Sequence, residues 1–511
     1  MPHLAKLMPN YITASIALSF GGFLNGYDTG CIGAIAHMKQ FSTSLGELSA
    51  TVRGITVSMI LLTGIIPALF AGQLADKYGR LRVILPGAAL FGLGALLQAT
   101  SFGLGQFILG RAVSGIGQGV FLGNIWVYLA EIAPSRRRGR LSALPFFMTT
   151  LGICVAYFSC FTTSSLEGST AWRLPYIAEI AVSIMLALVC LALPESPRWL
   201  LLWGRTQEAM TALGLLDFDM VEARREFLDT PQVQPSLSAR QNFLLPFRRP
   251  YRSRTFLALF ILSMVQLSGI DAITYYAPVL FDQAGISKAN SSLIASGVST
   301  ITMLIISIPA SMLADKWGRR TSAISGGVLL SGLMMLIGSL YAAGSVGTTG
   351  VARWIVIISV FAFGMTFCAT WGVVSKIYAS EIQPGNTRAA GNSIGMASAF
   401  FTNWLVALIT PILLSVSAYG AYFFFGGLTI FTVIVLAIYM PETQGRSLEN
   451  IQSEFRRPVF DNLFDSLCIP GIRRRVPSAQ DSPGAPIQLA YRTHEPSAAA
   501  SSSGVAALTL G

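Results

Sequence analysis

Asp28 and Arg111 are ionisable residues that lie well inside long apolar stretches of the sequence. A lone charge at the centre of a membrane-spanning helix costs about 2.5–3.5 kcal/mol on insertion scales, so such residues are rare and usually mark a path for ions or protons. We therefore expect both residues to lie on such a path through a membrane. The alternative is a buried ion pair with a purely structural role.

A charged hexapeptide occurs twice in the chain. ADKYGR begins at Ala75 and ADKWGR begins at Ala314, each directly after a long apolar stretch. Two other motifs recur in the same order, since YLAEIAP is echoed by YASEIQP and PESPRWL by PETQGRS. Three collinear pairs separated by about 245 residues indicate a duplicated unit, and this period is far too long for a solenoid. The chain therefore contains two homologous halves.

The composition indicates that the elements holding these residues lie in a membrane. Of the 511 residues, 53% are hydrophobic and only 12% are charged, against about 25% charged in a typical soluble domain. Apolar runs of about 20 residues, long enough to cross a bilayer, recur throughout, so we predict an all-α polytopic membrane protein with about twelve transmembrane helices. The predicted helices span residues 11–35, 52–74, 83–101, 103–130, 141–163, 175–194, 255–281, 291–313, 321–343, 352–378, 389–415 and 418–440.

The polar stretches divide these helices into domains. We expect two six-helix halves, residues 11–194 and 255–440, joined by a polar linker, residues 195–254, that forms short cytosolic helices. Residues 441–511 are predicted to form a cytosolic tail. Its content of Ser, Pro and Ala is typical of disordered segments, so most of this tail is expected to be disordered.

Basic residues crowd alternate loops between the predicted helices. Because Lys and Arg are enriched in the cytosolic loops of membrane proteins, these loops and both termini are placed in the cytosol. The net charge of +11 is then explained by topology, and the partner that it implies is the lipid bilayer and no nucleic acid. No cleavable signal peptide is apparent at the start of the sequence.

The sequence does not support several other classes of function. An ATP-driven pump needs the phosphate-binding loop G-x-x-x-x-G-K-[ST], which the chain lacks. The glycine-rich run at residues 115–119 lies inside an apolar helix, where small residues let helix backbones approach closely. The three histidines and six cysteines show neither a catalytic set nor metal-ligand spacing, so we expect no enzyme, no cofactor and no metal. Two six-helix repeats indicate instead a secondary transporter.

Ten motifs in order resemble the sugar porter family of the major facilitator superfamily. They are GYDTG, GQLADKYGRLR, GRAVSGIGQG, YLAEIAPSRRRG, PESPRWL, LSGIDAITYYAP, LADKWGRR, EIQP, NWLVALITP and PETQGRSLE. The resemblance covers residues 11–455, and the fungal members of the family look closest. It implies the major facilitator fold with two pseudo-symmetric halves, transport by alternating access, and a location in a fungal plasma membrane.

The resemblance implies a cytosolic gate made of two matching charge networks. Their residues are Asp76, Arg80, Glu131 and Arg138 in the first half and Asp315, Arg319, Glu381 and Arg388 in the second. Ion pairs between helix ends would hold the cytosolic side shut while the substrate site faces outward, and exposed pairs of about 0–1 kcal/mol each suit such a switch. The alternative is that these charges only cap helices and fix topology.

The resemblance also gives the two buried charges a role. Proton-coupled sugar porters carry an Asp in the first helix and an Arg in the fourth, as Asp28 and Arg111 do here. Arg111 would hold Asp28 ionised, and protonation would free the pair so that the carrier can turn over. We therefore expect proton-coupled symport.

The substrate positions implied by the resemblance are partly retained. Residues that match the binding positions of the family are Gln266, Tyr275, Tyr276, Asn403 and Trp404. Residues that stand where the family usually has amides are Phe146, Val265 and Met303. Asp271 replaces the usual Asn and Lys376 the usual Trp.

These replacements argue against glucose as the substrate. A site built for hydroxyl groups discriminates through its hydrogen-bonding partners, and three of them are lost here. We expect a small polyhydroxylated or carboxylated molecule, such as a sugar, a polyol or a sugar acid. Asp271 and Lys376 are expected to line the site, where they either pair or bind a charged ligand. The alternative for Lys376 is that it snorkels to the cytosolic surface.

Two other functions stay open. Export of a specialised metabolite fits the more apolar pocket, whereas the retained tyrosines and the Asn403-Trp404 pair fit a sugar-like substrate. A nutrient sensor that signals through its cytosolic tail belongs to another class, and the short low-complexity tail does not favour it.

Overall fold

The protein is a bundle of helices. The computed structural model describes residues 10–134, 138–218, 243–249, 251–286, 289–313, 318–347, 350–383, 387–417 and 419–443. Within these residues all regular structure is helical. The first group of helices comprises α2 (Tyr11–Leu18), α3 (Phe20–Ile35), α4 (Lys39–Leu45), α5 (Ala50–Tyr78), α6 (Arg80–Ala99), α7 (Leu104–Ile132), α8 (Arg138–Thr163) and α9 (Thr170–Ala192).

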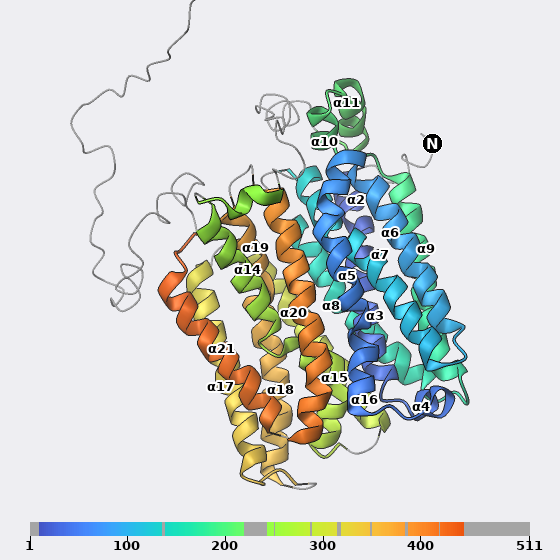
Figure 1. Cartoon of the computed structure of the whole chain (residues 1–511), viewed down its shortest axis with the longest axis vertical. Coiled ribbons are helices and arrows are strands. Elements are labelled where there is room, and N and C mark those ends of the chain that lie inside the picture. Colours follow the sequence, from blue (N-terminus) through green and yellow to red (C-terminus); the bar gives the residue numbers. More distant parts are fainter. Residues whose placement is uncertain are drawn as a thin grey trace, which may run out of the picture. The chain divides into compact units, whose positions relative to one another are not determined.

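A second group of helices follows a connecting segment. The connection contains α10 (Pro197–Leu202), α11 (Thr206–Leu215) and the 3₁₀ turn η2 (Leu245–Phe247). The second group comprises α14 (Arg252–Gln266), α15 (Ile270–Gln283), α16 (Ala289–Leu313), α17 (Arg319–Ala342), α18 (Val351–Ala369), α19 (Trp371–Glu381), α20 (Arg388–Val416) and α21 (Gly420–Tyr439). Figure 1 shows the first group on one side of the bundle and the second group on the other.

Eleven helical segments of the described residues are long and apolar enough to cross a membrane. The predicted first helix is instead two helices, α2 and α3, of 8 and 16 residues that meet at Ser19. The Ser19 hydroxyl donates a hydrogen bond to the carbonyl oxygen of Ser15 at 2.6 Å, and bonds of this kind bend helices. Neither helix alone is long enough to cross a bilayer. The all-α membrane fold expected from the sequence is confirmed.

Two further predicted helices are interrupted near their middle. Gly269 separates α14 from α15 with φ +92°, a left-handed conformation that favours glycine. Thr370 separates α18 from α19 with φ −125° and ψ −84°. Discontinuous helices of transporters commonly line the substrate site, and both Asp271 and Lys376 lie shortly after these breaks.

Helices of the two groups contact each other in two matching places. α5 packs along α20, and α8 packs along α16. These contacts join the second predicted span to the eleventh and the fifth to the eighth, so exchanging the two groups would convert one contact into the other. A third connection links α8 to α15, where the Tyr157 hydroxyl donates to the carbonyl oxygen of Thr274 at 2.6 Å.

Glycines of α7 allow close approach of its neighbours. A Cβ atom on Gly117 would lie 2.5 Å from the carbonyl oxygen of Gly87 in α6, and one on Gly119 would overlap the carbonyl oxygen of Gly64 in α5. Real Cβ atoms do not approach other atoms so closely. The packing role predicted for the glycine-rich run is therefore confirmed.

The α7 contacts predict that Gly117→Ala destabilises the protein. The added methyl group must push α6 and α7 apart, and overpacking of this kind costs about 1–3 kcal/mol. Thermal unfolding of purified protein in detergent should show a melting temperature several degrees lower. Gly123→Ala is the matched control on the same helix, because the nearest atom to its Cβ would lie 3.9 Å away. Equal losses in the two variants would contradict the packing explanation.

Candidate functional site

Asp28 and Arg111 meet in the interior of the first helix group. Arg111 Nη1 on α7 lies 2.5 Å from Asp28 Oδ1 on α3, and the two side chains are 0% and 2% exposed. Arg111 Nη2 also donates to the carbonyl oxygen of Val57 on α5 at 2.8 Å. The guanidinium thus joins three helices, α3 through a buried ion pair and α5 through a hydrogen bond.

Glu179 of α9 is a third ionisable residue at this site, and the sequence analysis missed it. Its side chain is fully buried and lies close enough to Asp28 and Arg111 for their charges to interact. Among the described residues, no donor reaches either carboxylate oxygen of Glu179. The signal was present, because Glu179 is a carboxylate inside a predicted apolar helix, as Asp28 is. The site contains two carboxylates and one guanidinium, so it is neutral when it holds one proton.

Three of the predicted substrate residues come together from different helices of the second group. Asp271 of α15 lies near Asn403 of α20 and interacts electrostatically with Lys376 of α19. Lys376 Nζ lies 4.7 Å from the ring centroid of Trp126 on α7. Lys376 therefore reaches toward the first helix group, which does not match a side chain that snorkels along its own helix.

The other predicted substrate residues have mixed environments. The Tyr276 hydroxyl donates to the carbonyl oxygen of Ala407 on α20 at 2.7 Å, so it connects α15 to α20. Tyr275 is buried and interacts with Thr29 of α3. Gln266, which ends α14, and Trp404 of α20 are half-buried.

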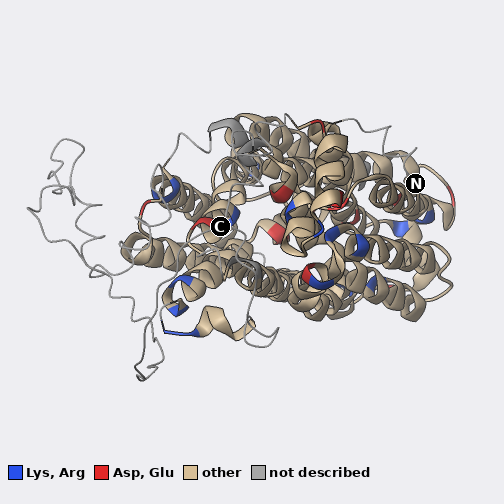
Figure 2. Ribbon diagram, turned by 90° about the horizontal axis from the view of Figure 1, so that it is seen from above, with Lys and Arg blue, Asp and Glu red and all other residues tan. Residues whose placement is uncertain are grey.

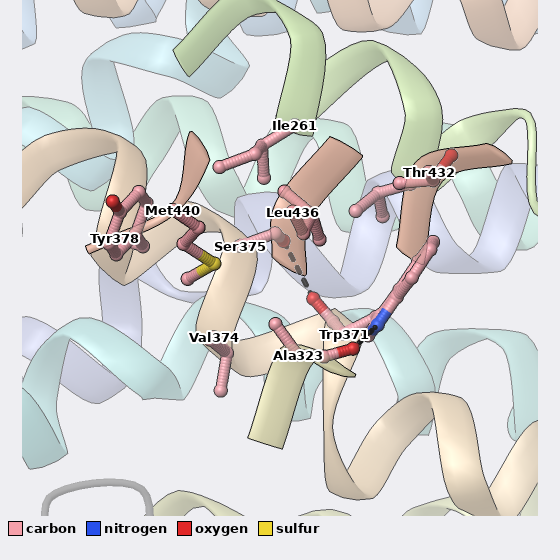
Figure 3. A pocket seen from close by; sticks show the side chains of 10 residues that line it. Ile261, Ala323, Trp371, Val374, Ser375, Tyr378, Thr432, Leu436 and Met440 are labelled. Atoms are coloured by element: carbon pink, nitrogen blue, oxygen red, sulfur yellow. Dashed lines mark hydrogen bonds between the residues drawn. The ribbon is translucent and has the colours of Figure 1, made fainter. Parts of the chain in front are cut away.

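An apolar pocket lies between α14, α17, α19 and α21 (Figure 3). Val265, which was expected to make the substrate site apolar, lines this pocket instead. Its polar groups are already engaged, because Trp371 Nε1 donates to Ala323 at 2.7 Å and the Ser375 hydroxyl donates to Trp371 at 2.6 Å. The pocket offers few partners to a sugar hydroxyl, so it is not the candidate substrate site.

Arg80 is the centre of a charge network at one end of the bundle, which we call the charged end. Its guanidinium lies 2.7 Å from Asp76 Oδ1 and 2.8 Å from Glu131 Oε1. The side chains of Arg80 and Glu131 are 6% and 15% exposed, whereas that of Asp76 is 53% exposed. Of the two acidic partners of Arg80, Glu131 is therefore the one better shielded from solvent. Figure 2, which looks down on this end, shows charged segments on both helix groups.

The second hexapeptide builds a matching network. Arg319 Nη2 lies 3.2 Å from Glu381 Oε1, and the Thr443 hydroxyl donates to Glu381 Oε2 at 2.8 Å. Arg80 begins α6 and Arg319 begins α17, so each arginine stands at the first position of a helix. The remaining predicted gate residues, Asp315 and the side chains of Arg138 and Arg388, lie outside the described part of the chain.

Two further carboxylates complete these networks and were not among the predicted gate residues. Glu195 accepts hydrogen bonds from the backbone N–H groups of Arg80 at 2.8 Å and Leu81 at 3.2 Å. Glu442 accepts them from Arg319 at 2.7 Å and Arg320 at 3.0 Å. A carboxylate at a helix N-terminus satisfies free N–H groups and complements the helix dipole. The echo between PESPRWL and PETQGRS was the signal for this pair.

The glycine of each hexapeptide makes room for its carboxylate. A Cβ on Gly79 would lie 2.6 Å from Glu195 Oε2, and a Cβ on Gly318 would lie 2.6 Å from Glu442 Oε2. Gly79 also has φ +109°, a conformation that side chains rarely adopt. All three repeated motifs therefore meet at the charged end, once in each helix group.

Comparisons with known proteins identify the family of the chain. The model of the family described as sugar (and other) transporter matches residues 14–455. The chain belongs to this family.

The relatives of this chain include transporters and a yeast protein described as a high glucose sensor. The glucose transporter GlcP of Staphylococcus epidermidis is 31% identical over 86% of this chain and 96% of its own length. The arabinose-proton symporter of Bacillus subtilis is 30% identical over 86% of this chain and 94% of its own length. Matching relatives come from bacteria, a plant, a yeast and an Aspergillus species.

Solved structures of the major facilitator superfamily share the fold. The proton:xylose symporter XylE bound to 6-bromo-6-deoxy-D-glucose superimposes with a TM-score of 0.72. The match covers 87% of this chain and 99% of that structure at 22% sequence identity. This similarity supports the major facilitator fold.

The charged end predicts that the two acidic partners of Arg80 differ in strength. Glu131→Gln should open the charged end more often than Asp76→Asn does. Exposed ion pairs contribute only about 0–1 kcal/mol to stability, whereas loss of a buried partner leaves the charge of Arg80 uncompensated. A cysteine at Ser393 can report this, since Ser393 of α20 contacts Gly72 of α5. Maleimide labelling in a background without native cysteines should accelerate several-fold in Glu131→Gln.

The sequence repeat extends this prediction to the second network. Asp315→Asn should resemble Asp76→Asn, and Glu381→Gln should resemble Glu131→Gln, in the labelling rate of the same cysteine. Unchanged labelling in all four variants would show that these charges do not hold the charged end closed.

Proposed function

We propose that the protein is a secondary active transporter that moves a small polyhydroxylated molecule, with or without a carboxylate, together with protons. The observation that carries this proposal is the buried site of Asp28, Arg111 and Glu179. A charge inside a membrane bundle is costly and usually functional. Membership in the sugar transporter family supplies the class of substrate, and a proton symporter is among the relatives.

The site suggests how proton binding is linked to movement. Arg111 holds α3 through Asp28 and α5 through the Val57 carbonyl oxygen. A proton on Asp28 removes the charge that attracts the guanidinium, and Glu179 is then the neighbouring carboxylate that compensates it. The attraction between Arg111 and Asp28 on α3 weakens, and the buried Arg111 cation still has the carboxylate of Glu179 nearby. Protonation thus changes which helices are joined, as a carrier that alternates between two openings requires.

The proposed architecture follows the sequence repeat. Residues 11–194 and 255–440 form the two six-helix halves that rock against each other, with the linker of residues 195–254 between them. The charged end is the cytosolic gate, and both termini lie in the cytosol. The protein is placed in the plasma membrane of a fungus. The α5–α20 and α8–α16 contacts, which are equivalent under exchange of the halves, support this arrangement.

The proposed substrate site lies between the breaks of the second helix group. Gln266, Asp271 and Asn403 supply hydrogen-bonding groups from α14, α15 and α20, and Lys376 supplies a positive charge from α19. Trp404 supplies an aromatic face. The mixture of amide, carboxylate and aromatic groups suits a molecule with hydroxyl groups in several directions.

Export of a specialised metabolite is the second candidate. It is favoured by Phe146, whose ring stands where the family usually has an amide and lies 5.6 Å from Lys376 Nζ. The two functions differ in direction: in membrane vesicles with an imposed pH gradient, a symporter moves substrate along with the proton gradient and an exporter of the antiport type moves it against.

Asp28→Asn tests the proton site. A labelled-uptake panel in a yeast without its own transporters first identifies the substrate. The variant should then lose accumulation against a gradient, because its side chain cannot take up a proton, and should retain part of its counterflow exchange. Asp282→Asn is the matched control, since Asp282 is an exposed carboxylate of α15. Concentrative uptake that survives in Asp28→Asn would exclude Asp28 as the proton site.

A further inference from the structure

Lys376 is held between the two helix groups by aromatic rings. Its Nζ lies 4.7 Å from the ring centroid of Trp126 on α7 and 5.6 Å from that of Phe146 on α8. The Phe146 ring also packs against α19, because a Cβ on Gly372 would lie 2.7 Å from its Cζ atom. Trp126 and Phe146 are half-buried, and the Lys376 side chain keeps an exposed surface. The Lys376 side chain is therefore not closed off from solvent by these rings.

The rings do not satisfy the hydrogen-bonding capacity of the ammonium. A lysine carries three N–H donors, whereas an aromatic face attracts the charge without accepting conventional hydrogen bonds. Asp271 interacts with Lys376 electrostatically, but the two side chains do not form a direct ion pair. The ammonium is thus held in place by the rings while its donors remain available to an anion.

Two acceptor atoms of the same cluster lack a hydrogen-bond partner in the described part of the chain. Asp271 Oδ2 and Asn403 Oδ1 are buried and have no hydrogen-bond partner among the described residues. Buried polar atoms are nearly always paired, so two such atoms next to each other indicate a ligand or water that supplies donors. Hydroxyl groups are donors of the required kind.

The cluster therefore contains hydrogen-bond acceptors, from Asp271 and Asn403, and a cation, from Lys376. A neutral hexose can satisfy the acceptors but brings no negative charge to the ammonium. A carboxylate brings a charge-assisted hydrogen bond, which is about twice as strong as a neutral one. A molecule with both hydroxyl groups and one carboxylate matches the whole cluster.

We infer that Lys376 recognises the carboxylate of the transported molecule and that the substrate class is the anionic monosaccharide acid. Asp271 and Asn403 bind its hydroxyl groups, and Trp126 and Phe146 keep the ammonium facing the ligand. This inference rests on the proposed transport function and narrows its substrate.

Matched ligand pairs test the inference on the purified full-length protein. The pairs are D-glucuronate with D-glucose, D-galacturonate with D-galactose, and D-gluconate with D-glucitol, so each acid differs from its partner in carrying a carboxylate. Dissociation constants are measured from thermal stabilisation at matched ionic strength. At least one acid is expected to bind tenfold or more tightly than its neutral partner.

Variants at Lys376 assign this preference to the ammonium. Lys376→Met keeps the length of the side chain and removes the charge, so it should weaken binding of the acid at least tenfold and that of the neutral partner less than threefold. Lys376→Arg should retain most of the preference. Arg353→Gln is the control, because it removes another cation that lies over a ring, 5.1 Å from Trp354 on α18, and it should leave all constants unchanged.

The outcomes separate this inference from the proposed function. Tighter binding of a neutral partner in the wild type, or an acid preference that persists in Lys376→Met, overturns the inference and leaves sugar transport standing. The wild-type comparison remains decisive if Lys376→Met does not fold. Binding of none of the six ligands contradicts both.

Discussion

The buried guanidinium of Arg111 constrains the whole first helix group. It has no exposed surface, and its neighbours are Asp28 at 2.5 Å and the Val57 carbonyl oxygen at 2.8 Å. Removing one partner of a buried ion pair costs about 3–5 kcal/mol, because the other charge is left uncompensated. The helices that carry these groups, α3, α5 and α7, must therefore stay close to Arg111. Glu179 offers a second carboxylate, and this makes it possible to exchange partners instead of losing one.

The charges at the charged end obey different energetics. Asp76 is half exposed, and such pairs contribute little to stability individually. Several such charges act together at each helix end. One cluster contains Arg80, Glu131 and the capping Glu195, and the other contains Arg319, Glu381 and the capping Glu442. In the proposed mechanism, the interior site holds the helices until a proton binds, whereas the networks at the helix ends open and close repeatedly.

Much of this could be predicted from the sequence, and the failures have physical causes. Long apolar runs determine where helices cross a membrane, so eleven of the twelve predicted span positions followed from the pattern of hydrophobic residues. The breaks at Ser19, Gly269 and Thr370 depend on local backbone conformation, which hydrophobicity does not report. The repeat placed Arg80 and Arg319 in equivalent surroundings, yet Glu195 and Glu442 were missed because capping depends on how the chain returns to a helix end. The direction of the Lys376 side chain could not be predicted, since it depends on rings from distant α7 and α8.

Coupling between proton and substrate through the Asp28, Arg111 and Glu179 site is tested most directly by recording both fluxes together. Proteoliposomes that contain a pH-sensitive dye and carry no imposed ion gradient are supplied with labelled substrate from outside. The wild-type protein is expected to acidify the interior as substrate enters, because each molecule brings a proton with it. Substrate entry at an unchanged internal pH would contradict proton coupling and would make the buried charges a structural element of a passive carrier.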